Sequence, residues 1–185
     1  MATESRRGSW SDVKRALRAC NAAGLTAVIR ALYEASPDNR RFLHARFLGS
    51  DTEIETYRKL ILDAVYPNLL GRKPVRIGEA QRLVRHFEQA TGHSVGTLDL
   101  LLTLVEAGSD LAADTGHGDY AYFGALEKML GEAIARIRSL PATDWPRWRE
   151  RLDGIVTRSA AIGWGYCDAT RDLVASLYPD RSADS

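Results

Sequence analysis

Apolar residues along this chain recur at intervals of three and four, and no segment shows the strict apolar–polar alternation of a half-buried strand. In the clearest example, one helical face collects Ile77, Ala80, Leu83, Val84 and Phe87. The pattern predicts an all-α protein of about nine amphipathic helices. We expect the helices to pack in antiparallel pairs, as an α-α superhelix or an irregular helical bundle.

Capping residues, glycines and prolines set the expected helix boundaries in the first half. Ser9 or Ser11 is expected to cap the first helix, which should stop near Gly24. The Ser36-Pro37 pair has the chemistry of a helix start, because proline fits the first turn. Pro67 is expected to end the fourth helix, since proline cannot continue it.

The second half continues the same pattern after a predicted loop at residues 68–75. We expect one helix from about residue 95 to 115 and another that Asp119 caps. Pro141 should break the chain after that helix, and a final helix is expected from about Tyr166.

The length of 185 residues fits one domain with a substantial core. We expect residues 1–8 to be disordered, residues 9–178 to form a single helical domain and residues 179–185 to be a disordered tail. No apolar stretch approaches the roughly 20 residues of a membrane span, and the first residues lack the apolar part of a signal peptide. A cytoplasmic protein without a membrane segment is therefore predicted.

The net charge of +1 conceals an asymmetry along the chain. Residues 1–91 hold 16 Lys and Arg against 10 Asp and Glu, whereas residues 92–185 hold 9 against 14. This asymmetry is compatible with a basic binding surface, with two halves that attract one another, or with an acidic surface for a basic partner.

The sequence Gly92-His93-Ser94-Val95-Gly96 matches the G-x-S-x-G pattern of a hydrolase nucleophile elbow. That pattern works only where a strand delivers the serine into a tight turn, and here a helix is predicted before it. We therefore interpret Ser94 as a helix cap and name no catalytic residue. The two cysteines, Cys20 and Cys167, are far apart and lack the spacing of a metal site.

An acidic stripe is predicted on the helix at residues 95–115. Four carboxylates and one threonine share a narrow sector at 100° per residue; the carboxylates are Asp99, Glu106, Asp110 and Asp114. They could bind a protein partner or a divalent cation, or face solvent or the arginines of an adjacent helix. Because one helix supplies all these groups, we predict no metal and no cofactor.

A basic set is the alternative binding surface. Its members lie between residues 40 and 86: Arg40, Arg41, Arg46, Arg72, Lys73, Arg76, Arg82, Arg85 and His86. Arginines in such number suit phosphate recognition and could follow a nucleic-acid backbone. The nearly neutral overall charge argues against a dedicated nucleic-acid protein.

Several segments carry a resemblance to a known family: residues 32–48, the helix with Tyr57-Arg58-Lys59, and residues 87–92, 105–108 and 162–165. Over most of residues 25–178, the chain resembles a family of small helical bacterial proteins recorded only as a domain of unknown function. The resemblance implies a single helical domain and brings no activity with it.

Two functions are expected from these observations. The first is a non-enzymatic adaptor or complex subunit that binds a protein partner through a helical surface, with the acidic stripe as the candidate site. The alternative is an accessory factor that binds nucleic acid through the basic set. The sequence predicts no particular oligomeric state.

Overall fold

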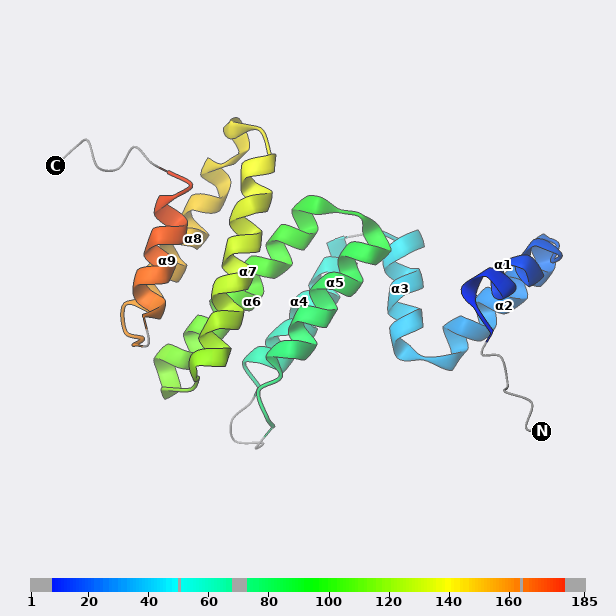
Figure 1. Cartoon of the computed structure of the whole chain (residues 1–185), viewed down its shortest axis with the longest axis horizontal. Helices are drawn as coiled ribbons and strands as arrows, with labels where there is room; N and C mark the ends of the chain where they lie inside the picture. The colour runs from blue at the N-terminus through cyan, green and yellow to red at the C-terminus, as the bar shows by residue number, and fades with distance from the viewer. Residues whose placement is uncertain (1–7, 50, 68–72, 164, 179–185) are drawn as a thin grey trace, which may run out of the picture. The chain divides into compact units, whose positions relative to one another are not determined.

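The computed structural model describes residues 8–49, 51–67, 73–163 and 165–178, and these contain nine α-helices and no strand (Figure 1). The prediction of an all-α fold is therefore confirmed. The helices are α1 (Trp10–Arg18), α2 (Ala22–Ala35), α3 (Pro37–Phe47), α4 (Asp51–Val65), α5 (Ile77–Thr91), α6 (Ser94–Thr115), α7 (Tyr120–Ser139), α8 (Pro146–Ser159) and α9 (Tyr166–Ala175), with a 3-10 turn η2 (Ala142–Asp144) before α8. The disorder predicted for residues 1–8 and 179–185 falls, except for Gly8, outside the described residues.

Two compact units divide the chain where a single domain over residues 9–178 was expected: an N-terminal unit, residues 1–48, and a C-terminal unit, residues 49–185. The reason is the distribution of buried side chains. Among the described residues of the N-terminal unit, only Ala45 is buried, whereas the C-terminal unit holds the rest of the core.

Helix α6 is the centre of the C-terminal unit. It packs against α4, α5, α7 and α8, and α9 in turn packs against α7 and α8 (Figure 1). Most of its 22 residues are buried, including Leu100, Leu104 and Leu111. At Gly108 the absence of a side chain lets α7 approach closely, because an added Cβ would lie 2.6 Å from Leu126 Cδ2.

Three predicted helix starts are confirmed by side-chain caps, and the predicted end of the first helix is wrong. Ser9 caps α1, Ser36 caps α3 and Asp119 caps α7. The first helix does not continue to Gly24. It ends at Arg18, and Asn21 then caps α2, with its Oδ1 accepting a hydrogen bond of 2.9 Å from the backbone N–H of Gly24.

None of the helices in the described part of the chain combines the length and apolar character that crossing a membrane requires.

Candidate functional site

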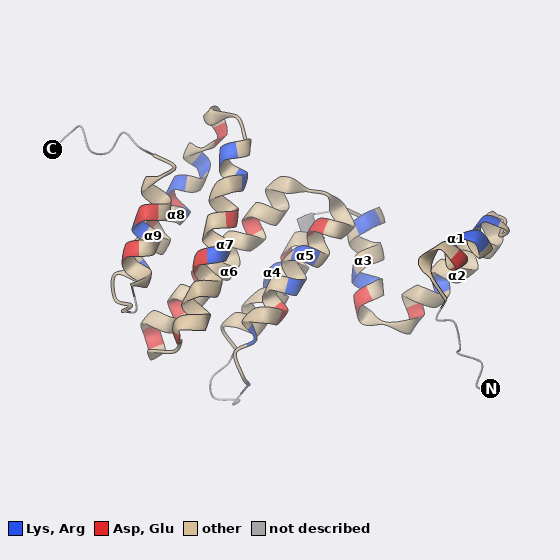
Figure 2. Ribbon diagram, in the orientation of Figure 1, with Lys and Arg blue, Asp and Glu red and all other residues tan. Residues whose placement is uncertain are grey.

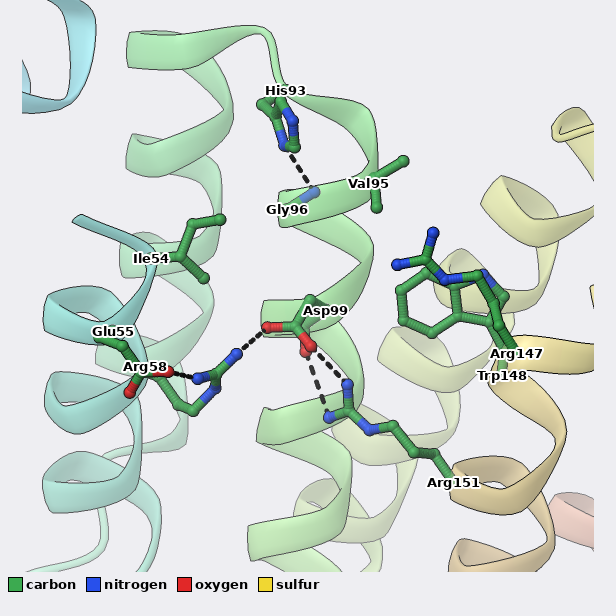
Figure 3. Close-up of a pocket in the computed structure, with 10 residues that line it drawn as sticks. All are labelled: Ile54, Glu55, Arg58, His93, Val95, Gly96, Asp99, Arg147, Trp148 and Arg151. Carbon is green, nitrogen blue, oxygen red and sulfur yellow. Dashed lines mark hydrogen bonds and ion pairs between the residues drawn. The ribbon is translucent and has the colours of Figure 1, made fainter. Parts of the chain in front are cut away.

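The acidic stripe turns toward neighbouring helices of the C-terminal unit. Toward the N-terminus of α6, Asp99 forms ion pairs with Arg58 of α4 and with Arg151 of α8 (Figure 3). The distance between Arg151 Nη1 and Asp99 Oδ1 is 2.6 Å. Arg151 also donates two hydrogen bonds to Glu106, one of 2.8 Å from Nε and one of 2.6 Å from Nη2. Such fork-to-fork pairs are among the stronger charge-assisted contacts in proteins. These carboxylates therefore tie α6 to α4 and α8.

The lower end of the stripe is engaged in the same way. Asp110 pairs with Arg158 of α8, and Asp114 accepts a hydrogen bond of 2.7 Å from the Tyr66 hydroxyl. Of the alternatives considered for the stripe, pairing with the arginines of adjacent helices is the one that the geometry supplies. Partner binding by these four carboxylates stays a prediction, but three of them already hold an arginine of their own chain.

The surroundings of these groups shift their proton affinities. Burial raises the pKa of Asp110 above its ordinary value of 3.8, and the neighbouring Asp114 and Glu106 add to that rise against the opposing effect of Arg158. Burial by itself would lower the pKa of Arg151, but the hydrogen bonds and charges of Glu106 and Asp99 outweigh it and raise the pKa. Arg151 therefore stays charged inside the helix packing.

An open pocket of about 510 Å³ lies beside this network, between α4, α6 and α8 (Figure 3). Its charged lining includes Arg58, Asp99 and Arg151, which are paired with one another. Among the described residues of its lining there is no serine, cysteine, threonine, lysine or tyrosine, and the carboxylate of Asp99 is held by two arginines. No group of three or more metal-ligating side chains occurs among the described residues. The pocket is best explained as the mouth of a structural ion network.

The G-x-S-x-G segment is a turn between two helices. Gly92 ends α5 in the left-handed conformation, with φ of 64°, and His93 caps α6 by accepting a hydrogen bond of 2.8 Å at Nδ1 from the backbone N–H of Gly96. Ser94 is the first residue of α6 and not its cap, which corrects the interpretation of the sequence. The helix before it, α5, agrees with the rejection of a nucleophile elbow.

The basic set is divided between the two units, so neither unit carries it whole (Figure 2). Arg40, Arg41 and Arg46 belong to the N-terminal unit. Arg72 lies outside the described residues, and the other members belong to the C-terminal unit.

Several members of the basic set already have partners. Arg41 pairs with Asp38, and Arg40 lies 5.1 Å from the centre of the Tyr33 ring. The other engaged members lie near α4 and α5: Lys73 and Arg76 both pair with Asp63, at 3.0 and 3.1 Å, and His86 Nδ1 lies 2.6 Å from the Tyr57 hydroxyl. Within the described part of the chain, Arg82 and Arg85 on α5 are exposed and make no ion pair.

Two further surfaces are the exposed apolar residues of α1 and those of α2. Helix α2 exposes Leu25, Val28, Ile29 and Leu32 to between 37% and 51%, and we call these four residues the α2 stripe. On α1, Trp10 is 69% exposed and Val13 is 47% exposed. Neither helix contains a buried residue.

The three- and four-residue spacing of these side chains is that of a buried helical face, so the spacing alone does not reveal their exposure. A signal was nevertheless present. Only Arg30 and Glu34 are charged in the 14 residues of α2, and they pair with each other at 2.9 Å on the side away from the α2 stripe. A helix of such composition is normally covered on its apolar side.

Comparison with protein-family models, with curated proteins and with solved structures finds no match to this chain. The resemblance to a family of small helical bacterial proteins therefore stays a prediction, and the function must be argued from the surfaces described above.

Proposed function

We propose that this protein is a non-enzymatic helical subunit that binds another protein chain through the exposed apolar face of α1 and α2. The observation that carries the proposal is the exposure of Trp10, Val13 and the α2 stripe, which the N-terminal unit does not bury by itself. Exposed apolar side chains that share one helical face, as those of the α2 stripe do, typify protein interaction sites, because covering them releases the free energy of hydrophobic burial.

The charged groups support the same choice of surface. The carboxylates of the acidic stripe are occupied by Arg58, Arg151, Arg158 and Tyr66, so they are less available to a partner than their spacing implies. By contrast, a large part of Trp10, Val13 and the α2 stripe remains exposed. The proposed binding site therefore moves from α6 to the N-terminal helices.

The test is capture of bound proteins from the native lysate with the tagged full chain, in the presence of nuclease. We expect a protein bound in stoichiometric amount, either a different chain or an untagged copy of this one. Leu25→Glu with Leu32→Glu should abolish the capture, because both charges fall in the α2 stripe. The matched control is Ala23→Glu, which adds the same charge to an exposed position on the opposite side of α2 and should leave capture intact. Equal capture by both variants would contradict the proposal.

A second function, nucleic-acid binding, is favoured only by Arg82 and Arg85, the two exposed arginines of α5 without an ion pair among the described residues. Binding of this kind would weaken steeply with salt, since each phosphate contact releases counterions. It would also be lost on replacing both arginines by glutamate. Absence of binding at low salt would remove this candidate.

A further inference from the structure

The turn after α5 and the turn after α6 have the same sequence, Thr-Gly-His. The first runs from Thr91 to His93 and the second from Thr115 to His117. In both turns the glycine is left-handed, with φ of 64° and 69°. In both, the threonine Oγ1 accepts a hydrogen bond from the backbone N–H of the histidine, at 3.0 and 3.2 Å. The two histidines therefore stand on turns of the same construction.

The side chains of the two histidines make different contacts. His93 caps α6, because its Nδ1 accepts a hydrogen bond of 2.8 Å from the backbone N–H of Gly96 (Figure 3). Helix α7 is capped by Asp119 instead. The ring of His117 lies edge-on to the ring of Tyr122, with 5.1 Å between the ring centres. Of the two imidazoles, that of His93 is the one that serves as a helix cap.

A histidine cap works in one protonation state. An imidazole nitrogen that accepts a hydrogen bond carries no proton, so the cap requires the neutral ring with its hydrogen on Nε2. Protonation of the ring removes the acceptor and places a positive charge at the positive end of the helix dipole. Serine, threonine and asparagine, three of the usual caps, do not titrate in this way.

The charges around His93 add to this effect. Five charged side chains line the described part of the neighbouring pocket: Glu55 and Arg58 of α4, Asp99 of α6, and Arg147 and Arg151 of α8. Both acids are held by arginines, and on α5 the acid nearest the turn, Glu88, pairs with Arg136 of α7. Arg147 lies over the Trp148 ring and makes no ion pair with the described residues. The unpaired charge in this lining is therefore positive, and it opposes a second positive charge on His93.

The capped turn is also a point of close packing between α5 and α6. An added Cβ at Gly96 would lie 2.7 Å from His93 Nδ1 and 2.9 Å from Phe87 Cε1 of α5. Val95 and Gly96 line the pocket as well. Loss of the cap therefore loosens a helix start on which α5 packs and which forms one wall of the pocket.

We propose that His93 is an acid-sensitive cap, whose protonation releases the first turn of α6 and loosens the turn between α5 and α6. The side chain is exposed, so protons reach it from solvent. The folded state favours the unprotonated ring, and the unfolded chain has no such preference. The contribution of the cap is thus present at neutral pH and is lost as the pH falls through the range in which histidine titrates. This inference is independent of the proposed function, since it involves neither α1 nor α2.

The first experiment compares the wild type with His93→Asn in urea unfolding, at about pH 7.5 and at about pH 5, on either side of the range in which histidine titrates. Asparagine caps helices without titrating. We expect the unfolding constant of the wild type, divided by that of His93→Asn, to rise about fivefold on acidification, the ratio that a typical cap supplies. The remaining histidines titrate in both proteins and cancel in this ratio.

The matched control is His117→Asn, the same substitution at the equivalent position of the other Thr-Gly-His turn. Its ratio to the wild type should stay within about twofold between the two pH values. A ratio for His93→Asn that does not change with pH, or one that changes no more than that of His117→Asn, would overturn the inference.

The second experiment observes the ring in the wild type, so it does not depend on the folding of a variant. Nitrogen NMR of the imidazole at about pH 8 distinguishes a hydrogen on Nε2 from one on Nδ1, and we expect Nε2 for His93. On acidification, the amide signal of Gly96 should shift with the same midpoint as the ring of His93. A hydrogen on Nδ1 at about pH 8, or a Gly96 amide that does not follow the ring, would also overturn the inference.

Discussion

At the residue scale, the packing of α6 on α7 depends on a glycine. The carbonyl oxygen of Gly108 accepts a hydrogen bond of 3.0 Å from the Tyr122 hydroxyl. The side chain of Leu126 fills the space where a Cβ of residue 108 would lie. Burial of Tyr122 raises the pKa of its hydroxyl, which therefore donates as a neutral group at ordinary pH. The close approach of the two helices thus uses both the missing side chain and the backbone carbonyl of Gly108.

We predict that Gly108→Ala lowers the free energy of unfolding by about 1–3 kcal/mol, because the new methyl group overpacks a full core. Gly124→Ala on α7 is the matched control. An added Cβ there meets nothing within 4 Å, so the higher helix propensity of alanine should stabilise the protein by about 0.5–1 kcal/mol. Urea unfolding measures both, and a loss of stability in both variants would contradict this account.

A second residue-scale prediction concerns Asp110. Since burial raises its pKa, the folded state holds the proton more tightly than the unfolded chain does. The contribution of Asp110 to stability is therefore fully present below pH 3.8 and is lost as the pH rises through the raised pKa.

Asp110→Asn cannot ionise and escapes this loss. It should match the parent protein at acidic pH and exceed it near neutral pH, by less than about 1 kcal/mol because the side chain is 41% exposed and solvent screens it. Urea unfolding of both proteins from acidic to neutral pH gives the difference. A variant that is less stable at neutral pH would show that the pair with Arg158 outweighs the cost of burial.

At the element scale, Arg151 of α8 links this helix to α6 through ion pairs. Its guanidinium reaches both Asp99 and Glu106 while its side chain is only 26% exposed. Arg151→Met should lower the free energy of unfolding by about 2 kcal/mol, since it leaves two partly buried carboxylates without their shared cation. Arg85→Ala, on an exposed arginine, should change it by less than about 0.5 kcal/mol. Similar values for the two variants in urea unfolding would contradict the fastening role.

The helices themselves were largely predictable, because capping and periodicity are local. Asp119 and the Ser36-Pro37 pair mark true helix starts. The end of α1 was missed because Gly24 was read as a stop, whereas it stands inside the first turn of α2 and donates to the Asn21 cap. Glycine is found both at the start and just after the end of helices, and a neighbouring capping side chain such as Asn21 distinguishes a start from an end.

Whether a helical face is buried, and by which residues, depends on contacts between segments that are far apart in the sequence. The acidic stripe was correctly placed on one sector of α6, but the arginines that occupy it come from α4 and α8, far away in the sequence. Conversely, Leu25 and Leu32 have the spacing of a core and are exposed. Periodicity identifies a face, and only the assembled neighbours decide what covers it.

At the scale of the whole molecule, the uneven distribution of buried residues makes the C-terminal unit self-sufficient. We predict that a fragment of residues 49–185 folds alone and unfolds cooperatively at nearly the temperature of the full chain, because it retains nearly all the buried side chains of the described residues. Circular dichroism and calorimetry test this. A fragment without a cooperative transition would show that the N-terminal unit stabilises the core.

The exposed stripe of α2 also has a consequence for the life of the protein in a cell. Under the proposed function, a newly made chain that has not yet bound a partner would display Leu25, Val28, Ile29 and Leu32 on a helix with little core of its own. Chaperones and proteases act on such exposed apolar segments. Turnover would therefore be fastest when the partner is scarce, and the steady-state level of the protein would follow its assembly as well as its synthesis.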